Sequence, residues 1–151
     1  MSNTTIKNAW KDAETAIFEA LVSATGATAR QNAFLGEIPN ITDAWGFSSG
    51  GGSVSDITAA GCYSALQFPA RISGRFSSRD SAQEFAGLVI KWLSETTNAQ
   101  EKYGNVQIFR PSSNPEITEE TVELAQESGN SLHYSLQWDF ELTFNTRTEY
   151  S

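Results

Sequence analysis

Few residues in this sequence are of the types that carry out catalysis. The chain has one cysteine, Cys62, and one histidine, His133. One cysteine excludes an intramolecular disulfide, and a Cys/His zinc cluster within one chain needs about four ligands. A lone cysteine is more often a small buried hydrophobic residue than a reactive group, and we expect that of Cys62. No Ser-His-Asp order surrounds His133, so we expect a hydrogen-bonded or exposed structural histidine.

Asp139 and Glu141 are the candidates for a pair of catalytic carboxylates. They lie two residues apart in an alternating stretch, so both side chains point to the same side of a strand. Their expected partners are Arg71 and Arg75, which alternate in the same way on an earlier stretch. Exposed pairs of this kind contribute only about 0.2–1 kcal/mol, so we expect them to select strand register. Because no metal-ligand spacing or phosphate-binding glycine motif is present, we predict no catalytic, cofactor-binding or metal-binding residue and no enzyme activity.

These side chains are positioned by a long strand near the C-terminus. From Leu132 to Phe144 every second residue is apolar, and the residues from His133 to Asn145 between them are polar. This alternation predicts a strand with one face under the core and one face in water. About 13 residues at 3.3 Å each span roughly 43 Å, which exceeds the diameter of a small domain. We therefore expect the strand to reach past its own subunit.

Three further strands are predicted. A long one covers CYSALQFPARISGRF, with an edge or a bulge at Pro69 because proline cannot donate to a ladder. Short ones are expected from Phe34 to Ile38 and over NVQIFR. The acidic segment from Pro115 to Glu127 fits either a helix or a strand edge, and its charges favour a solvated face over an acidic recognition patch.

Two amphipathic helices complete the pattern. The first has apolar residues at three- and four-residue steps and ends near Gly26; these residues are Ile6, Ala9, Trp10, Ala13, Ile17, Leu21 and Ala24. The second begins near Ser81, which has capping-box spacing to Glu84. Its apolar stripe consists of Ala82, Phe85, Ala86, Val89, Trp92 and Leu93.

Together these elements predict one α+β domain over residues 1–151. It is a two-layer sandwich in which two helices cover one face of a mostly antiparallel sheet with long strands. A flexible Gly/Ser loop is expected from Ser48 to Ser53. Trp45 and Phe47 at its root either anchor the loop on the core or contact a neighbouring subunit.

The composition limits the possible partners. The formal net charge of −8 argues against tight nucleic-acid binding, which depends on lysine and arginine, but not against DNA passing nearby. No secretory signal and no apolar run of about 20 residues is seen, so we expect no membrane partner and assembly in a cytoplasm.

The order of elements resembles that of tail-terminator (tail-completion) proteins of tailed bacteriophages or prophages. The resemblance is carried by PARISGRFSSRDSAQEFAGLVIKWL, then NVQIFRPSSNPEITEETVEL, then SLHYSLQWDFELTFNT. It extends over nearly the whole chain and is strongest from Phe68 to Phe144. The segment from Ser48 to Ser53, with its three glycines, departs from the family pattern, and the resemblance is weakest from Trp45 to Cys62.

The resemblance implies a structural virion protein of the tail and neck. Such proteins form a hexameric ring that caps the tail tube, ends its polymerisation and joins tail to head, while DNA passes through the lumen. The implied partners are other copies of the chain, the tail-tube protein and the head–tail connector proteins. The candidate interface or lumen residues are Trp45, Phe47, Arg71, Arg75, Glu116, Glu119, Glu120 and Glu123.

Three alternatives stay open at this point. The chain can be a tail-tube, head-completion or neck protein of the same particle. It can be a small α+β enzyme or ligand-binding domain, although the inward series of the last strand offers only Tyr134 and Trp138 as polar groups for a pocket. It can also be a dimeric module that adds strands edge to edge.

Overall fold

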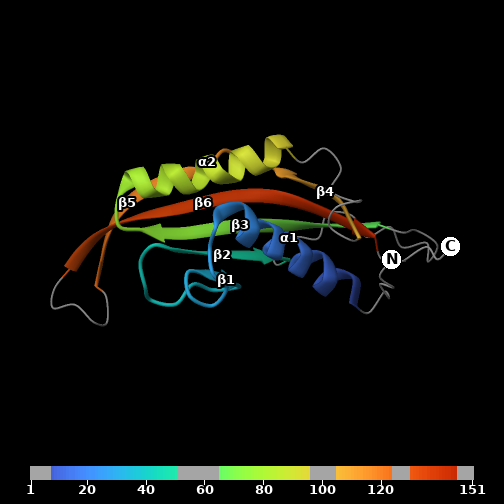
Figure 1. Cartoon of the computed structure of the whole chain (residues 1–151), viewed down its shortest axis with the longest axis horizontal. Helices are drawn as coiled ribbons and strands as arrows, with labels where there is room; N and C mark the ends of the chain where they lie inside the picture. Colours follow the sequence, from blue (N-terminus) through green and yellow to red (C-terminus); the bar gives the residue numbers. More distant parts are fainter. Residues whose placement is uncertain (1–7, 51–64, 96–104, 124–129, 146–151) are drawn as a thin grey trace.

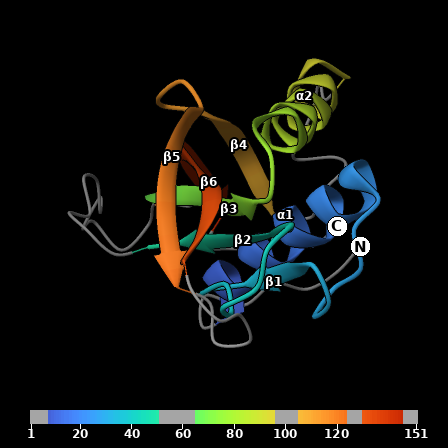
Figure 2. The same ribbon diagram turned by 90° about the vertical axis from the view of Figure 1, so that its left-hand side faces the viewer.

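A computed structural model describes residues 8–50, 65–95, 105–123 and 130–145. In this part of the chain two helices pack on a mixed, mostly antiparallel sheet of six strands, which confirms the predicted α+β class. Both helices cover the same face of the sheet (Figures 1 and 2). The elements are α1 (Ala9–Thr25), β1 (Ala33–Leu35), β2 (Ala44–Ser49), β3 (Ala65–Phe76), α2 (Arg79–Glu95), β4 (Val106–Pro111), β5 (Glu116–Glu123) and β6 (Asn130–Asn145).

The long strand β6 holds the sheet together. Along one side it pairs with β3, from Phe76 opposite Tyr134 to Ala65 opposite Asn145. Along its other side β4 and β5 lie end to end, so that β6 has three partners. The order across the sheet is β1-β2-β3-β6-β4, with β5 also beside β6. The strand is 16 residues long because it must span both β4 and β5.

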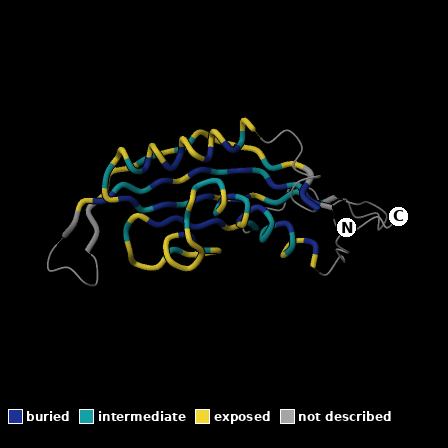
Figure 3. The backbone as a smooth tube through the Cα atoms, viewed as in Figure 1, coloured by how far each residue is buried: buried dark blue, intermediate teal, exposed yellow. Residues whose placement is uncertain are grey.

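The core lies between the helices and the inner face of the sheet (Figure 3). On β6 the inward residues are Leu136, Trp138, Phe140, Leu142 and Phe144, all at most 3% exposed. Ile17 and Leu21 of α1 and Val89 of α2 are fully buried over them. The predicted alternation is therefore confirmed from Leu136 to Phe144.

The start of β6 does not follow this rule. Leu132 is 48% exposed, whereas His133 is only 3% exposed. The pairing with β3 begins at Tyr134, so at Leu132 the strand is paired with β5 alone. The prediction that the apolar series packs under the helices from Leu132 onward is wrong at this end.

Pro69 is not at a bulge, but on the β2 side it lies one residue past the last β2–β3 pair, Ser49 opposite Ala70, which fits the predicted edge. It is opposite Glu141 in the unbroken β3–β6 ladder. The N and O atoms of one residue face the same neighbouring strand, and the Pro69 carbonyl accepts from the N–H of Gly50, 2.8 Å away, just past β2. The missing donor therefore faces the end of β2 and costs the β6 ladder nothing.

The helix boundaries are set by local hydrogen bonds. α1 ends as predicted at Gly26, which has φ +70°. α2 begins at Arg79, two residues before the predicted cap Ser81, and the Ser81 N–H donates to Ser78 Oγ at 3.1 Å. Ser78 is therefore the capping residue, and Ser81 lies in the first turn.

Three other predictions need correction or completion. Trp10 is 45% exposed instead of belonging to the buried stripe of α1, where Phe18 is buried instead. The strand predicted from Phe34 to Ile38 runs only from Ala33 to Leu35, and Gly36 then has φ +100°. The acidic segment, for which the sequence fitted either a helix or a strand, forms a strand over Glu116–Glu123. Cys62 and residues 51–53 lie outside the described residues.

Candidate functional site

The face of the sheet opposite the helices carries the charged residues that the sequence singled out. Arg71 on β3 lies opposite Asp139 on β6, and its Nε donates to Asp139 Oδ1 at 2.8 Å. The two side chains are 49% and 48% exposed. The predicted cross-strand partnership of Arg71 is confirmed. In solvent such a pair guides strand register more than it stabilises the fold.

Glu141 has a different partner from the one predicted. On β3 it is opposite Pro69, and on β4 it is opposite Arg110. Arg110 Nε and Nη2 donate to the two carboxylate oxygens of Glu141 at 3.0 and 3.4 Å. The polar face thus carries two separate Arg–carboxylate pairs, one on each side of β6.

Arg75 binds backbone instead of a carboxylate. It is opposite Ser135, and its Nη1 donates to the carbonyl oxygens of Pro39 and Ile41 at 3.2 and 3.3 Å. These carbonyls belong to the segment between β1 and β2, which crosses the outer face at Gly46. A Cβ at Gly46 would lie 2.7 Å from the Gly36 carbonyl oxygen. Arg75 therefore fastens a segment over the sheet, and the prediction that it pairs with a carboxylate of β6 is wrong.

Trp45 and Phe47 are core residues. They are 3% and 0% exposed and lie in β2, which also contains Ser48 and Ser49, so the prediction that the loop begins at Ser48 is wrong. The Trp45 ring contacts those of Phe18 and Phe85, with centroids 5.8 and 5.4 Å apart. Of the two roles considered for these aromatics, anchoring fits the structure. Because both side chains are buried in the core of the subunit, the prediction that they form an interface or line a lumen is wrong.

The acidic residues lie on an outer edge of the sheet. Glu116, Glu119 and Glu120 are exposed on β5, whose only described partner strand is β6. Glu120 also accepts a hydrogen bond from Ser135 Oγ. The backbone of Glu123 ends the strand, and its side chain lies outside the described residues. Charge on an edge strand opposes pairing with another sheet, which gives these glutamates a structural role.

His133 is buried, and within the described part of the chain its side chain makes no hydrogen bond. It is 3% exposed, and neither of its ring nitrogens has a hydrogen-bond partner among the described residues. The prediction of a satisfied or exposed histidine is therefore wrong. Across the ladder it faces Glu120. No serine or cysteine nucleophile is seen to bond with it, so it forms no catalytic dyad in the described ranges.

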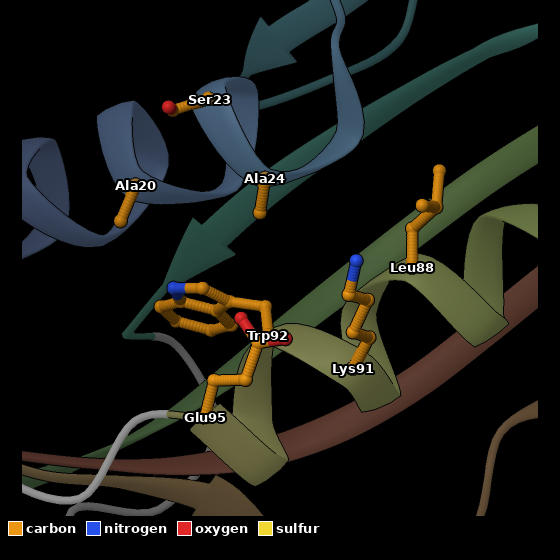
Figure 4. A pocket seen from close by; sticks show the side chains of 7 residues that line it. All are labelled: Ala20, Ser23, Ala24, Leu88, Lys91, Trp92 and Glu95. Atoms are coloured by element: carbon orange, nitrogen blue, oxygen red, sulfur yellow. The ribbon is translucent and has the colours of Figure 1, made fainter.

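Sequence reasoning missed a groove between the two helices. Two open hollows, of about 280 and 360 Å³, share Leu88 as a lining residue. Ala20 and Ala24 of α1 form one wall of the first hollow, and Leu88 and Lys91 of α2 form the other, with the Trp92 indole between the helices (Figure 4). The second hollow continues past Glu84 to Trp45 and Asp43. The only sequence signal for it is Leu88, an apolar residue outside the buried stripe of α2.

The described residues contain no group of three or more His, Cys, Asp or Glu side chains placed to hold a metal ion. Among the described helices, none has the length and apolarity to cross a membrane. No protein-family model and no curated protein matches this sequence.

Proposed function

We propose that this chain is a tail terminator of a tailed bacteriophage or prophage. It forms a hexameric ring that caps the tail tube, ends tube growth and joins the tail to the neck of the head. The element order that carries the resemblance is retained in the structure: α1, β3 running into α2, then β4, β5 and a long β6. In this proposal the protein has no catalytic role and works in the virion.

The observation that carries the proposal is the arm formed by β5 and β6. The described residues of β6 before Tyr134 pair with β5 and not with β3, and the two strands extend past α2 and β3 (Figure 1). A two-stranded ribbon alone is at most marginally stable in water. The arm also exposes Leu132 to 48%. A neighbouring subunit that covers this leucine would stabilise the arm.

An arm that docks on a different surface of the next subunit makes a heterologous contact. Repetition of such a contact forms a closed ring when the rotations between successive subunits add up to one full turn. The polar face with its Arg71–Asp139 and Arg110–Glu141 pairs is then available to line a water-filled channel. A net charge of −8 suits a lumen that must let DNA pass without holding it.

The test is the mass of the purified chain by light scattering, followed by negative-stain images, alone and with tail-tube subunits of the same phage. Hexameric rings, or rings formed on tube ends, are the expected result. Open stacks or long tubes would instead identify a tail-tube subunit. A monomer that neither forms rings nor caps tubes under any condition would overturn the proposal.

A matched pair of variants tests the role of the arm. Leu132→Glu is expected to abolish ring formation, because it places a charge where an apolar contact forms. Ile90→Glu is the control, since Ile90 is similarly exposed, at 52%, but lies on α2. Equal loss of rings in both variants, or in neither, would exclude the arm as the ring contact.

A further inference from the structure

The groove between α1 and α2 is long enough for one helical segment to lie along it, and its two hollows are of a size to accept side chains of that segment. Its lining runs along α2 from Ser81 to Glu95, which at 1.5 Å per residue is about 21 Å. The helices run in opposite directions on either side of it, with Ala20 opposite the Glu95 end and Ala24 nearer Leu88 (Figure 4). The small side chains of α1 leave room for the side chains of a third element.

The floor and walls of the groove are apolar at their centre. Trp45 and Trp92 reach it from below and are 3% and 8% exposed. Leu88 lines both hollows and is 40% exposed. A row of apolar side chains spaced as on a helix would cover Leu88 and fill both hollows.

The charges along the groove select the occupant. Three carboxylates line it, those of Asp43, Glu84 and Glu95, against the single ammonium group of Lys91. Asp43 also accepts from the N–H and Oγ of Ser77, at 3.1 Å in each case, so its carboxylate is fixed in position. The excess of negative charge favours a partner with lysine or arginine beside its apolar row.

The same charges exclude the arm of a second copy as the occupant. β5 presents Glu116, Glu119 and Glu120, and these would meet the carboxylates of the groove. Like charges brought together across an interface weaken binding. The groove is therefore a surface separate from the arm contact that we assign to the ring.

We infer that the α1–α2 groove binds an amphipathic helix of another protein, with an apolar ridge on Leu88 and basic residues against Glu84 and Glu95. This inference is independent of the proposed function. It holds whether or not the chain forms rings, and the test below uses no tail component.

The probe is a fluorescein-labelled synthetic peptide of leucine and lysine, about 14 residues long to match the groove, with its leucines on one helical face. Binding is measured by fluorescence anisotropy at physiological salt. A peptide of the same composition with its leucines spread around the helix reports non-specific attraction to the acidic chain. The patterned peptide is expected to bind about tenfold more tightly than the spread one.

Two matched pairs of variants locate the site. Leu88→Lys is expected to weaken binding about tenfold, while Ile90→Lys, with the same charge change on the same helix, leaves it within about twofold. Glu84→Gln combined with Glu95→Gln should weaken it more than Glu19→Gln combined with Glu37→Gln, since Glu19 and Glu37 do not line either hollow. Circular dichroism checks that each variant is folded.

Failure of the patterned peptide to bind would overturn the inference. Equal binding of the two peptides, or equal weakening by Leu88→Lys and Ile90→Lys, would also overturn it, because either result indicates attraction to the net charge alone.

Discussion

Gly50 lies against the indole of Trp10, and a Cβ atom at Gly50 would stand 2.5 Å from Cζ2 of that ring. Gly50 also has φ +87°, in the left-handed region that favours glycine. Next to it, the Trp10 indole N–H donates to Ser49 Oγ at 2.8 Å, and the Glu14 carboxylate accepts from the Ser49 N–H at 3.0 Å. The end of β2 is thereby fixed on α1, which explains why an exposed tryptophan is placed here.

Replacing Gly50 with alanine is expected to destabilise the fold by about 1–3 kcal/mol, from backbone strain together with the steric clash. The measurement is the free energy of unfolding from urea titration. Gly87→Ala is the control: nothing lies within 4 Å of its Cβ position in α2, so helix propensity should raise the stability by about 0.5–1 kcal/mol.

The clash can be separated from the strain by a second background. If Trp10 is first replaced by alanine, Gly50→Ala should cost less, because only the φ penalty remains. An identical cost in both backgrounds would show that the indole does not confine Gly50.

The Arg71–Asp139 pair is expected to contribute little to stability. A double-mutant cycle with alanine at both positions should give a coupling energy below about 1 kcal/mol, because both side chains are half exposed. The coupling should shrink when salt is raised from 0.1 to about 1 M, where the Debye length falls to about 3 Å. A coupling that is large and insensitive to salt would contradict the solvent-exposed geometry.

The capping residue of α2 gives a direct test of where that helix begins. Ser78→Ala is expected to cost about 1 kcal/mol of unfolding free energy, because the Ser81 N–H loses its acceptor. Ser81→Ala should cost less, since its hydroxyl only accepts from Ser78 Oγ at 2.9 Å. If urea titrations showed that Ser81→Ala costs more unfolding free energy than Ser78→Ala, Ser81 would be the capping residue.

His133 is expected to tolerate an apolar replacement. His133→Leu removes two buried nitrogens that find no hydrogen-bond partner in the described ranges, so stability should stay constant or rise by up to about 1 kcal/mol. Leu136→Ala on the same strand serves as the comparison, since emptying that fully buried position should cost about 2–5 kcal/mol. Loss of a buried hydrogen bond costs about 1–3 kcal/mol. A loss of about 2 kcal/mol or more in His133→Leu would therefore show that the imidazole makes a hydrogen bond.

Periodicity predicted those parts of the fold in which one face of an element is buried along its length. Burial of alternate residues in β6, and of every third or fourth residue in the helices, leaves a repeating pattern that one sequence reveals. The missing donor of Pro69 allowed an edge or a bulge to be predicted, but the choice between them depended on where β2 ends, which the local pattern does not show. The partner of Glu141 was not predictable either, because it lies on β4. The alternation within a strand does not indicate which strands are its neighbours in the sheet.

The candidate site was less predictable than the fold. Trp45 and Phe47 precede a glycine-rich stretch, so the sequence could not distinguish an anchor from a contact surface. The groove depends on the distance between two helices that are more than 50 residues apart in the chain, from Thr25 to Arg79. Only Leu88, an apolar residue on the wrong side of its helix, hinted at it.

The central position of β6 also bears on how the protein is made. Its three partner strands all precede it in the chain, and the ladder with β3 joins residues as far apart as Ala65 and Asn145. Because translation delivers the N-terminal segments first, β3, β4 and β5 leave the ribosome before the strand that joins them exists. During that interval the core-facing side chains of these strands are not yet packed beside β6. The nascent chain is therefore expected to be most prone to aggregation just before β6 emerges. If synthesis stalled at that point, the sheet would lack its central strand.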